Sequence, residues 1–261
     1  MVDRARRVPI RGRTGKEVRV ASTRVPRVRP PERELAPIGI IIPVRDRLAP
    51  MARTLKGIFN QTLPPSWVTI SDLGSSAEVA EALQGLAETF GFQYLRIEYF
   101  GIWNKGLCFN TALKNSPEAM YVMQVDADVV LQPHALEALM RALQDADAVV
   151  SVPLHEGKRM SEWSVGGCVV FPRDWLFETR GIDEAYEGWG NQDIDLWDRA
   201  QKSLRVARVE EDLSWHQPHE PQESRSDEVN VEKNLTRRVQ QWEGANLPVN
   251  PDEWGNGVID G

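Results

Sequence analysis

Two aspartates, Asp126 and Asp128, stand one residue apart and directly follow the apolar run 121–125. A short apolar run is typical of a buried strand, and where such a strand ends both carboxylates can turn toward one pocket. Carboxylate oxygens are the ligands that Mg²⁺ and Mn²⁺ prefer, often shared with a diphosphate. Because Asp-x-Asp also occurs in solvated turns, its position after this run is what indicates a metal site.

A second cluster combines glycine, tryptophan and acidic residues. Gly-Trp-Gly at 188–190 precedes Asn191, Asp193 and Asp195. Asn191 is a good helix N-cap and acids favour a first helical turn, so a capped helix start accounts for part of the pattern. It does not account for Trp189, whose indole between two glycines could hold the apolar face of a sugar. An Asp beside it could accept a proton from a hydroxyl.

Two histidines follow, at His216 and His219. A neutral imidazole at His216 could complete the coordination shell of a Mn²⁺ held by Asp128, and His219 is the alternative ligand. A single histidine in such a segment can equally be structural or exposed.

Strands and helices must position these groups, and they alternate along the chain. Strands are expected at 38–43, 67–71, 94–99, 121–125, 148–152 and 168–171; helices are expected at 49–60, 76–90, 104–115, 133–143, 191–203 and 226–242. The alternation favours an α/β fold, a mostly parallel sheet flanked by helices. Ligands of such sheets bind at the carboxyl ends of strands, where Asp72 and Asp126 both fall. From Gly244 onward the composition predicts loop or tail.

Charge separates the first 36 residues from the rest. Residues 1–36 hold eleven basic and four acidic side chains, 11 - 4 = +7, so the remainder carries -7 - 7 = -14. Such a basic arm can be a flexible solvated tail, or it can contact nucleic acid, anionic lipid or the acidic body. Cys108 and Cys168 form no metal or disulfide pattern. With no apolar run long enough to span a bilayer and no secretory signal, we expect a cytoplasmic protein with reduced thiols.

Several segments resemble a known family. The run Ile40–Arg47 resembles the opening strand of family 2 glycosyltransferases, and Asn60–Thr62 resembles the end of their first helix. Asp72–Ser75 is similar to their Asp-Asp-Gly-Ser nucleotide loop, with Leu73 as a departure.

The second half resembles β-1,4-galactosyltransferases and chondroitin-type polymerases. Their Phe-Asn pattern is similar to Trp103–Asn110, and their Asp-Val-Asp to Asp126–Asp128. Their Gly-Gly-Val is similar to Gly166–Cys168, and their Gly-Trp-Gly-Gly-Glu-Asp-Asp-Asp to residues 188–195. Their downstream metal-binding histidine is similar to His216.

The resemblance covers about residues 37–220 and implies a GT-A fold, a UDP-sugar donor, Mn²⁺ (or Mg²⁺) and inversion at the anomeric carbon. It implies that Asp128 and His216 bind the metal and that Asp193 is the catalytic base for a glycan or other hydroxyl acceptor. The residues it assigns to the nucleotide sugar, with Asp72 at the uracil and Lys105 near the base or phosphates, are Pro43, Asp46, Asp72, Lys105, Asp126, Trp189 and Gly190.

These expectations divide the chain into a basic arm (1–36), a GT-A domain (37–222) and a C-terminal helix and tail (223–261). Two alternatives stay open. A nucleotidyltransferase could use the same sheet and carboxylates, although no glycine-rich phosphate loop follows the first strand. A non-catalytic carbohydrate- or nucleic-acid-binding protein on the same scaffold is favoured by the arm and by Gln192, where the family has Glu.

Overall fold

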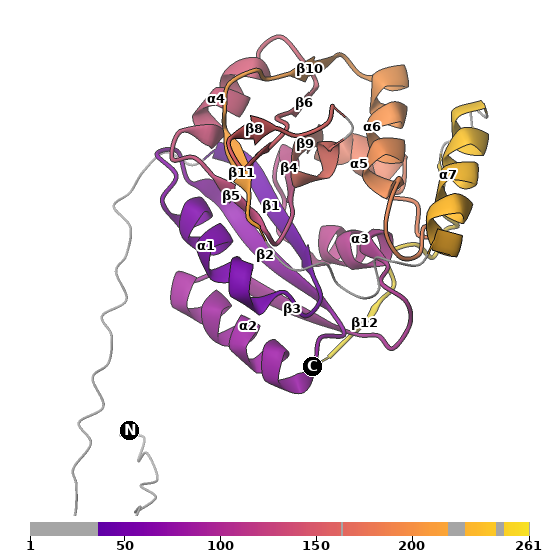
Figure 1. Ribbon diagram of the computed structural model, residues 1–261, viewed down its shortest axis with the longest axis horizontal. Helices are drawn as coiled ribbons and strands as arrows, with labels where there is room; N and C mark the ends of the chain where they lie inside the picture. Colours follow the sequence, from indigo (N-terminus) through magenta and orange to yellow (C-terminus); the bar gives the residue numbers. More distant parts are fainter. Residues whose placement is uncertain (1–35, 163, 219–227, 244–247, 261) are drawn as a thin grey trace, which may run out of the picture. The chain divides into compact units, whose positions relative to one another are not determined.

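The computed structural model describes residues 36–162, 164–218, 228–243 and 248–260, so residues 1–35 of the predicted basic arm lie outside the described residues, and Ala36 belongs to the first strand. Within them the centre is an eight-stranded sheet of order β10-β6-β9-β4-β1-β2-β3-β12 (Figure 1). The strands β4, β1, β2 and β3 are mutually parallel, whereas β9 runs antiparallel to β4 and β6. Their bounds are β1 Ala36–Val44, β2 Pro65–Leu73, β3 Gln93–Glu98, β4 Tyr121–Val125, β6 Ala148–Val150, β9 Cys168–Pro172, β10 Val206–Arg208 and β12 Val258–Ile259.

Helices cover both faces of this sheet (Figure 1). One face carries α1 (Leu48–Phe59), α2 (Ala77–Phe90) and α4 (Ala135–Ala142); the other carries α3 (Lys105–Asn115), α5 (Arg173–Glu178) and α6 (Gln192–Ser203). The sequence of strand β1 is apolar because both of its faces are covered by helices. Successive side chains of a strand point to opposite faces, so Ile40 and Ile42 pack in the α1 layer while Ile41 packs in the α3 layer. This confirms the predicted GT-A arrangement of a mostly parallel sheet flanked by helices.

A second, four-stranded sheet lies beside the end of β4. Its order is β5-β11-β7-β8, with bounds β5 Val129–Leu131, β11 Ser214–His216, β7 Leu154–His155 and β8 Lys158–Arg159. The antiparallel β5–β11 pair sets His216 opposite Val129, and the Gln217 amide donates to the Asp128 carbonyl at 2.8 Å. The small sheet therefore brings a residue from late in the chain to the Asp-x-Asp segment.

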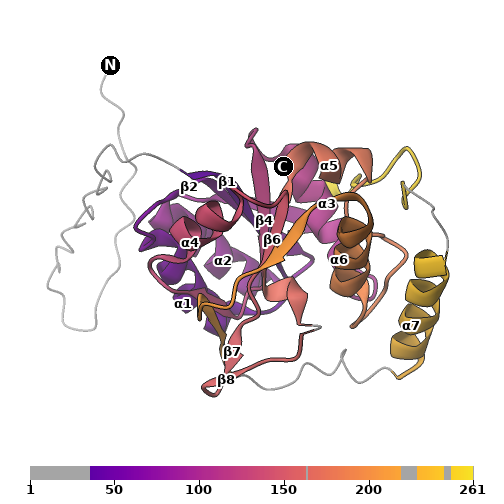
Figure 2. The same cartoon turned by 90° about the horizontal axis from the view of Figure 1, so that it is seen from above.

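The C-terminal residues are more ordered than their composition indicates. Helix α7 (Glu228–Glu243) confirms the predicted helix, and it lies beside α6 in Figure 2. The expectation of loop or tail after Gly244 is wrong for Val258–Ile259, because β12 pairs antiparallel with β3. Trp254 is also buried, against Phe177 and beside Lys114. Two paired residues are too few to show a periodicity in sequence. The boundary predicted at residue 222 falls among residues outside the described ranges.

The remaining structural expectations concern thiols and membranes. Cys108 and Cys168 are both free and buried, and burial raises the pKa of each thiol to about 12. Buried thiols of this kind are poor nucleophiles and poor metal ligands. Among the described residues no helix has the length and apolarity needed to cross a membrane.

Candidate active site

A cleft of about 940 Å³ opens at the carboxyl ends of β1 and β4. It is lined by the residues that follow these two strands, by the first turn of α6 and by the loop before it. The structure brings nine of the ten predicted site residues to this cleft, namely Pro43, Asp46, Lys105, Asp126, Asp128, Trp189, Gly190, Asp193 and His216. Segments far apart in the chain thus converge on one cavity of a size that suits a small molecule.

Asp72 is the exception. It is fully buried at the end of β2 and is not among the residues that line the cleft. One of its carboxylate oxygens accepts from the Ser75 amide at 3.0 Å, and the other accepts from the Tyr94 hydroxyl at 2.6 Å. Ser75 in turn accepts from the amide of Asp46, which does line the cleft. In this structure Asp72 therefore supports the loop that carries Asp46.

Lys105 links the Asp-x-Asp segment to the predicted base. Its Nζ lies 2.6 Å from Asp126 Oδ1 and 2.9 Å from Asp193 Oδ1. Burial alone would lower the pKa of Lys105, but the two carboxylates raise it above its ordinary value, so the group is an ammonium ion. For Asp126, burial raises the pKa to about 6, and Lys105 opposes this effect. Lys105 begins α3, whose N-cap is the Asn104 side chain bonded to the Leu107 amide.

The Asp193 carboxylate is held by two donors. Lys105 is one, and the Gln124 amide, from the penultimate residue of the buried strand β4, donates to Asp193 Oδ1 at 2.9 Å. Gln124 also donates to the Gly166 carbonyl at 2.6 Å, which fixes the direction of its own amide. About a fifth of the Asp193 side chain stays exposed, at 22%. The carboxylate is therefore both oriented and open to the cleft.

Gly166 permits this arrangement, and we predict that Gly166→Ala lowers turnover. A Cβ at Gly166 would lie 2.4 Å from Asp193 Oδ2, closer than real contacts allow. Because Asp193 is already bonded to Lys105 and Gln124, the carboxylate must leave its donors or the backbone must shift, and a small displacement at a reacting group can cost about 100-fold in rate. Steady-state kinetics measures the effect.

Gly85→Ala is the matched control, because a Cβ there meets nothing within 4 Å on helix α2. Replacing a helical glycine in open space should raise stability by about 0.5–1 kcal/mol and leave turnover unchanged. Turnover of Gly166→Ala equal to that of Gly85→Ala would show that the close approach to Asp193 has no catalytic consequence.

The segment before α6 has an unusual backbone. Gly188, Gly190 and Asn191 all have positive φ values, of 70°, 101° and 68°. Asn191 adopts this left-handed conformation without a side-chain hydrogen bond to the helix, so the side-chain cap considered from sequence is absent. A left-handed non-glycine residue such as Asn191 is costly, and such residues cluster at functional sites. Gly188 and Gly190 flank Trp189, which is about half exposed and lines the cleft.

Two other acids near this segment are engaged elsewhere. Asp195 is buried and bonded to Arg199 Nε at 3.0 Å; burial raises its pKa, and Arg199 opposes this effect. Glu187 pairs with Lys233 at 3.0 Å and does not line the cleft. Asp193 is therefore the acid of this segment that faces the cavity.

The predicted metal ligands are adjacent. His216 Nε2 lies 3.5 Å from Asp128 Oδ1, and Arg47 lies 4.0 Å from Asp128 Oδ2. Over the residues described, no group of three or more His, Cys, Asp and Glu side chains is arranged to hold a metal. The oxygen and nitrogen donors present fit two positions on Mn²⁺ or Mg²⁺, with diphosphate and water needed for the others. The alternative ligand His219 lies outside the described residues.

The sequence matches glycosyl transferase family 2 over residues 39–186, more than half of the chain. The chain is a member of glycosyl transferase family 2. The match includes Asp126–Asp128 and continues through Gly166–Cys168. It therefore crosses the point where the second resemblance begins, and the comparisons give no evidence of a distinct galactosyltransferase-like half. No curated protein matches the chain.

Solved structures share the fold of this chain. TarS 1-349 from S. aureus in complex with UDP-GlcNAc is 13% identical, with a TM-score of 0.64 over 81% of this chain and 68% of that chain. The mannosyltransferase PcManGT from Pyrobaculum calidifontis, in complex with GDP-Man and Mn2+, is 17% identical, with a TM-score of 0.64 over 84% of this chain and 67% of that chain. Against a longer TarS chain, this chain covers 36% of its length. At these identities the likeness establishes the GT-A fold.

Three residues that line the cleft or bond to a residue lining it were given no site role from sequence. In the sequence, Gln124 falls within the apolar run 121–125, and Arg47 is the last residue of the segment that resembles the family's opening strand. Gln192 appears only as a Gln where the family has Glu. Gln192 is buried at the cleft and its Oε1 has no hydrogen-bond partner among the described residues. A polar residue inside an otherwise apolar predicted strand was the available signal for Gln124.

Proposed function

We propose that this family 2 enzyme transfers a hexose or N-acetylhexosamine from a UDP-sugar to an acceptor hydroxyl, with inversion and with a divalent metal. One observation carries the proposal. Asp193, held by Lys105 and Gln124, lies in the same cleft as the Asp128–His216 pair. A metal site for a diphosphate and an oriented carboxylate for a hydroxyl are the two parts that such a transfer requires.

In the proposed reaction, the chain's own residues would carry the proton transfer and orient the reacting groups. Asp193 would accept the acceptor's hydroxyl proton while that oxygen attacks the anomeric carbon. The bond from that carbon to UDP would break on the opposite side, and its electron pair would leave with UDP. Lys105 would keep Asp193 and Asp126 in place, and Arg47 would add positive charge beside the diphosphate. Mn²⁺ or Mg²⁺ on Asp128 and His216 would neutralise charge on the leaving diphosphate.

The donor is the first point to test, because the similar structures hold UDP-GlcNAc in one case and GDP-Man in the other. Calorimetric titration with UDP-, GDP- and TDP-sugars, with and without Mn²⁺, should show metal-dependent binding of a UDP-sugar. Preference for a GDP-sugar would overturn the donor assignment. Product analysis separates the alternatives: release of pyrophosphate would indicate a nucleotidyltransferase, and binding without turnover a non-catalytic protein.

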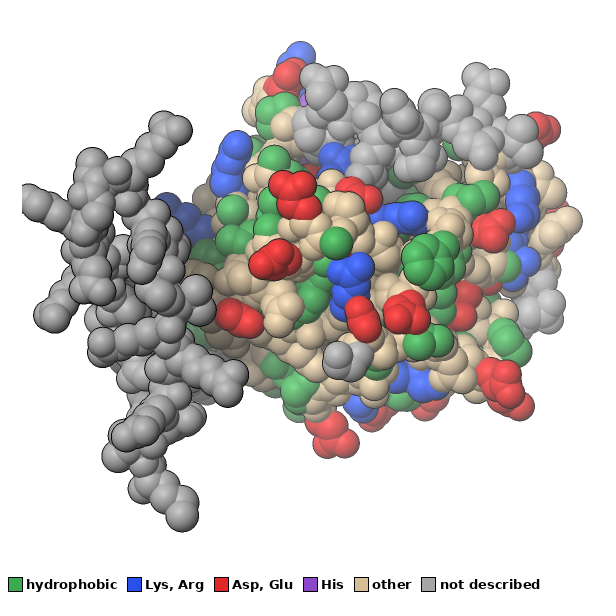
Figure 3. All heavy atoms as spheres, turned by 90° about the horizontal axis from the view of Figure 1, so that it is seen from below, with side chains coloured by type: hydrophobic (Ala, Val, Ile, Leu, Met, Phe, Trp, Pro, Cys, Tyr) green, Lys and Arg blue, Asp and Glu red, His purple; other side chains and the backbone are tan. Residues whose placement is uncertain are grey.

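Deleting residues 1–35 should leave UDP-sugar hydrolysis nearly unchanged, because β1 begins at Ala36, which is buried. If the basic arm recruits a polyanionic acceptor, the deletion should lower transfer to that acceptor alone, and binding should weaken with salt. On the face seen in Figure 3, acidic and basic side chains of the described residues are interspersed, so that face offers the arm no continuous acidic patch.

Hydrolysis and transfer measured side by side test the arm. Equal loss of both activities would mean that the arm belongs to the fold and that the boundary at residue 36 is misplaced. Unchanged activity in both assays would leave the arm without a role in acceptor capture.

A further inference from the structure

Helix α7 is attached to the rest of the protein by polar groups. Its most buried side chains are Asn230 and Asn234, whereas Leu235, Val239 and Trp242 are about half exposed. An ordinary surface helix does the opposite and buries its apolar stripe. Because buried polar side chains require well-placed partners, the docking of α7 depends on the specific residues that those side chains contact.

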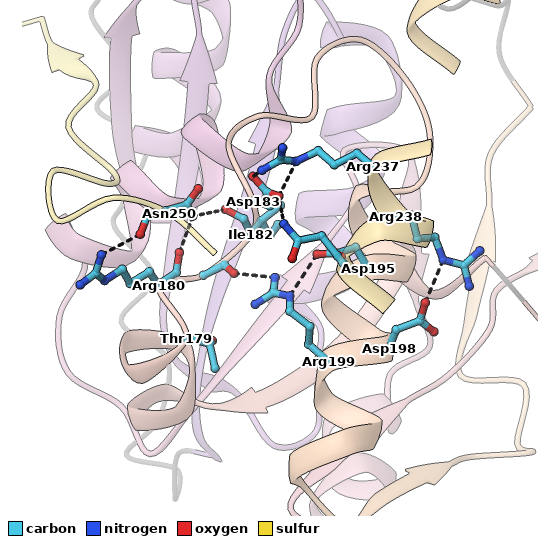
Figure 4. Close-up of polar contacts among 12 residues, drawn as sticks. Thr179, Arg180, Ile182, Asp183, Asp195, Asp198, Arg199, Arg237, Arg238 and Asn250 are labelled. Carbon is cyan, nitrogen blue, oxygen red and sulfur yellow. Dashed lines mark hydrogen bonds and ion pairs between the residues drawn. The ribbon is translucent and has the colours of Figure 1, made fainter. Parts of the chain in front are cut away.

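Those partners lie in the loop that leads into the cleft. Arg237 donates from Nε and Nη2 to the two oxygens of buried Asp183, at 2.6 and 2.9 Å (Figure 4). Gln241 also reaches Asp183, at 3.3 Å. Asn234 Nδ2 donates to the carbonyls of Glu187 at 2.8 Å and Trp189 at 3.3 Å. The helix therefore bonds to the backbone of the residue that lines the cleft.

The same helix also holds α6, which carries Asp193 in its first turn. Arg238 Nε pairs with Asp198 of α6 at 2.8 Å, next to the Arg199–Asp195 pair (Figure 4). Arg199 of α6 also donates to the Gly181 carbonyl at 2.8 Å, which links α6 to the start of the loop. Loop 181–190, α6 and α7 are thus joined in a ring of charge-assisted hydrogen bonds, which are stronger and more directional than neutral ones.

We propose that α7 is a positioning helix for the side of the cleft that carries Trp189 and Asp193, acting through Arg237 and Asn234 on residues 183–190. The helix begins at Glu228, beyond the residues 39–186 that match the family. The expected effect of α7 on catalysis rests on the proposed function, whereas its expected effect on the order of loop 183–190 does not. Neither residue needs to contact a substrate, because Arg237 acts through Asp183 and Asn234 through backbone carbonyls.

The effect on loop order is tested by hydrogen exchange of the full chain without ligand. The amides of Ala185, Tyr186 and Gly188 all donate within the loop or to Trp103, so they report its order. In Arg237→Met they should exchange about tenfold faster or more, as expected when a local opening becomes easier. Arg238→Met is the matched control: the adjacent arginine on the same helix loses its bond to α6 but none of the loop contacts described here.

The effect on catalysis is tested on the same variants by UDP-sugar hydrolysis. We expect kcat to fall about tenfold or more in Arg237→Met, because small displacements of positioned groups are costly, with UDP affinity nearly unchanged. Asn234→Ala leaves no buried charge without its partner. It should likewise lower kcat with UDP affinity nearly unchanged, and it replaces Arg237→Met in the test if that variant does not fold.

The outcomes separate the two proposals. Loop exchange that is unchanged, or accelerated equally in Arg237→Met and Arg238→Met, would overturn the positioning role. Faster loop exchange with normal kcat would overturn the effect on catalysis. Absence of turnover in the unmodified chain would count against the proposed function alone, since the exchange result stands without it.

Discussion

Asp193→Asn is expected to lower turnover by about 100-fold or more, the usual scale for losing a general base, while UDP-sugar binding persists. An amide has nearly the same shape as the carboxylate but cannot accept the acceptor's proton. Asp193 lies between Lys105 and Gln124 with part of its surface open to the cleft, so the variant keeps the size of the side chain but loses both the basic oxygen and the ion pair with Lys105. Steady-state kinetics with a separate calorimetric measurement of UDP affinity gives both quantities.

Glu187→Gln is the control for this variant. Glu187 belongs to the same loop but pairs with Lys233 and does not line the cleft, so near-normal turnover is expected. Near-normal turnover of Asp193→Asn would move the role of base to Asp195 or Glu187, and a large loss in Glu187→Gln would choose between them.

Asp128→Ala is expected to remove metal-dependent UDP binding without unfolding the protein. Asp128 supplies an oxygen ligand at the cleft and lies 3.5 Å from the His216 ring nitrogen. Since the loss of outer-shell partners already costs metal affinity about 10- to 100-fold, loss of a direct ligand should cost at least as much. His216→Ala should give a smaller loss. Calorimetry of UDP binding with and without Mn²⁺ measures both effects.

His155→Ala is the matched control for the histidine. The His155 ring packs edge-on against His216 at 5.3 Å between centroids but does not line the cleft. Its loss should leave the metal dependence of UDP binding intact. Unchanged metal-dependent affinity in both Asp128→Ala and His216→Ala would remove this assignment, and the same titration on His219→Ala would then test the alternative ligand.

Continuous apolar runs explain which strands were predictable. Residues 38–43 form such a run, and the structure places Ile40 and Ile42 in one layer and Ile41 in the other. The short strands of the second sheet were not predicted, because β5 and β11 have three residues each and gain their pairing from each other. Three residues carry too little pattern to distinguish a strand from a loop.

The site residues were predictable where their position depends on the end of a strand, and less so where it depends on side-chain contacts between different elements. Asp126 and Asp128 follow β4 directly, so the topology alone takes them to the ligand-binding edge. The contact of Lys105 Nζ with both Asp126 and Asp193 requires the first turns of α3 and α6 to lie near the end of β4, on the same face of the sheet. Asp72 also ends a strand, yet its local hydrogen bonds turn its carboxylate away from the cleft. Side-chain direction of this kind depends on neighbours that sequence spacing does not specify.

The two-residue strand β12 has a consequence for shortened chains. It occupies the outer side of β3, pairing at Ile97 and Glu98, and the Asp260 amide adds a bond to the Arg96 carbonyl at 2.9 Å. A chain that ends before Val258 would leave these β3 backbone groups open, and an open sheet edge is a template for strands of other molecules. The last residues would then govern whether the protein remains dispersed or self-associates, a property separate from catalysis in the cleft after β1 and β4.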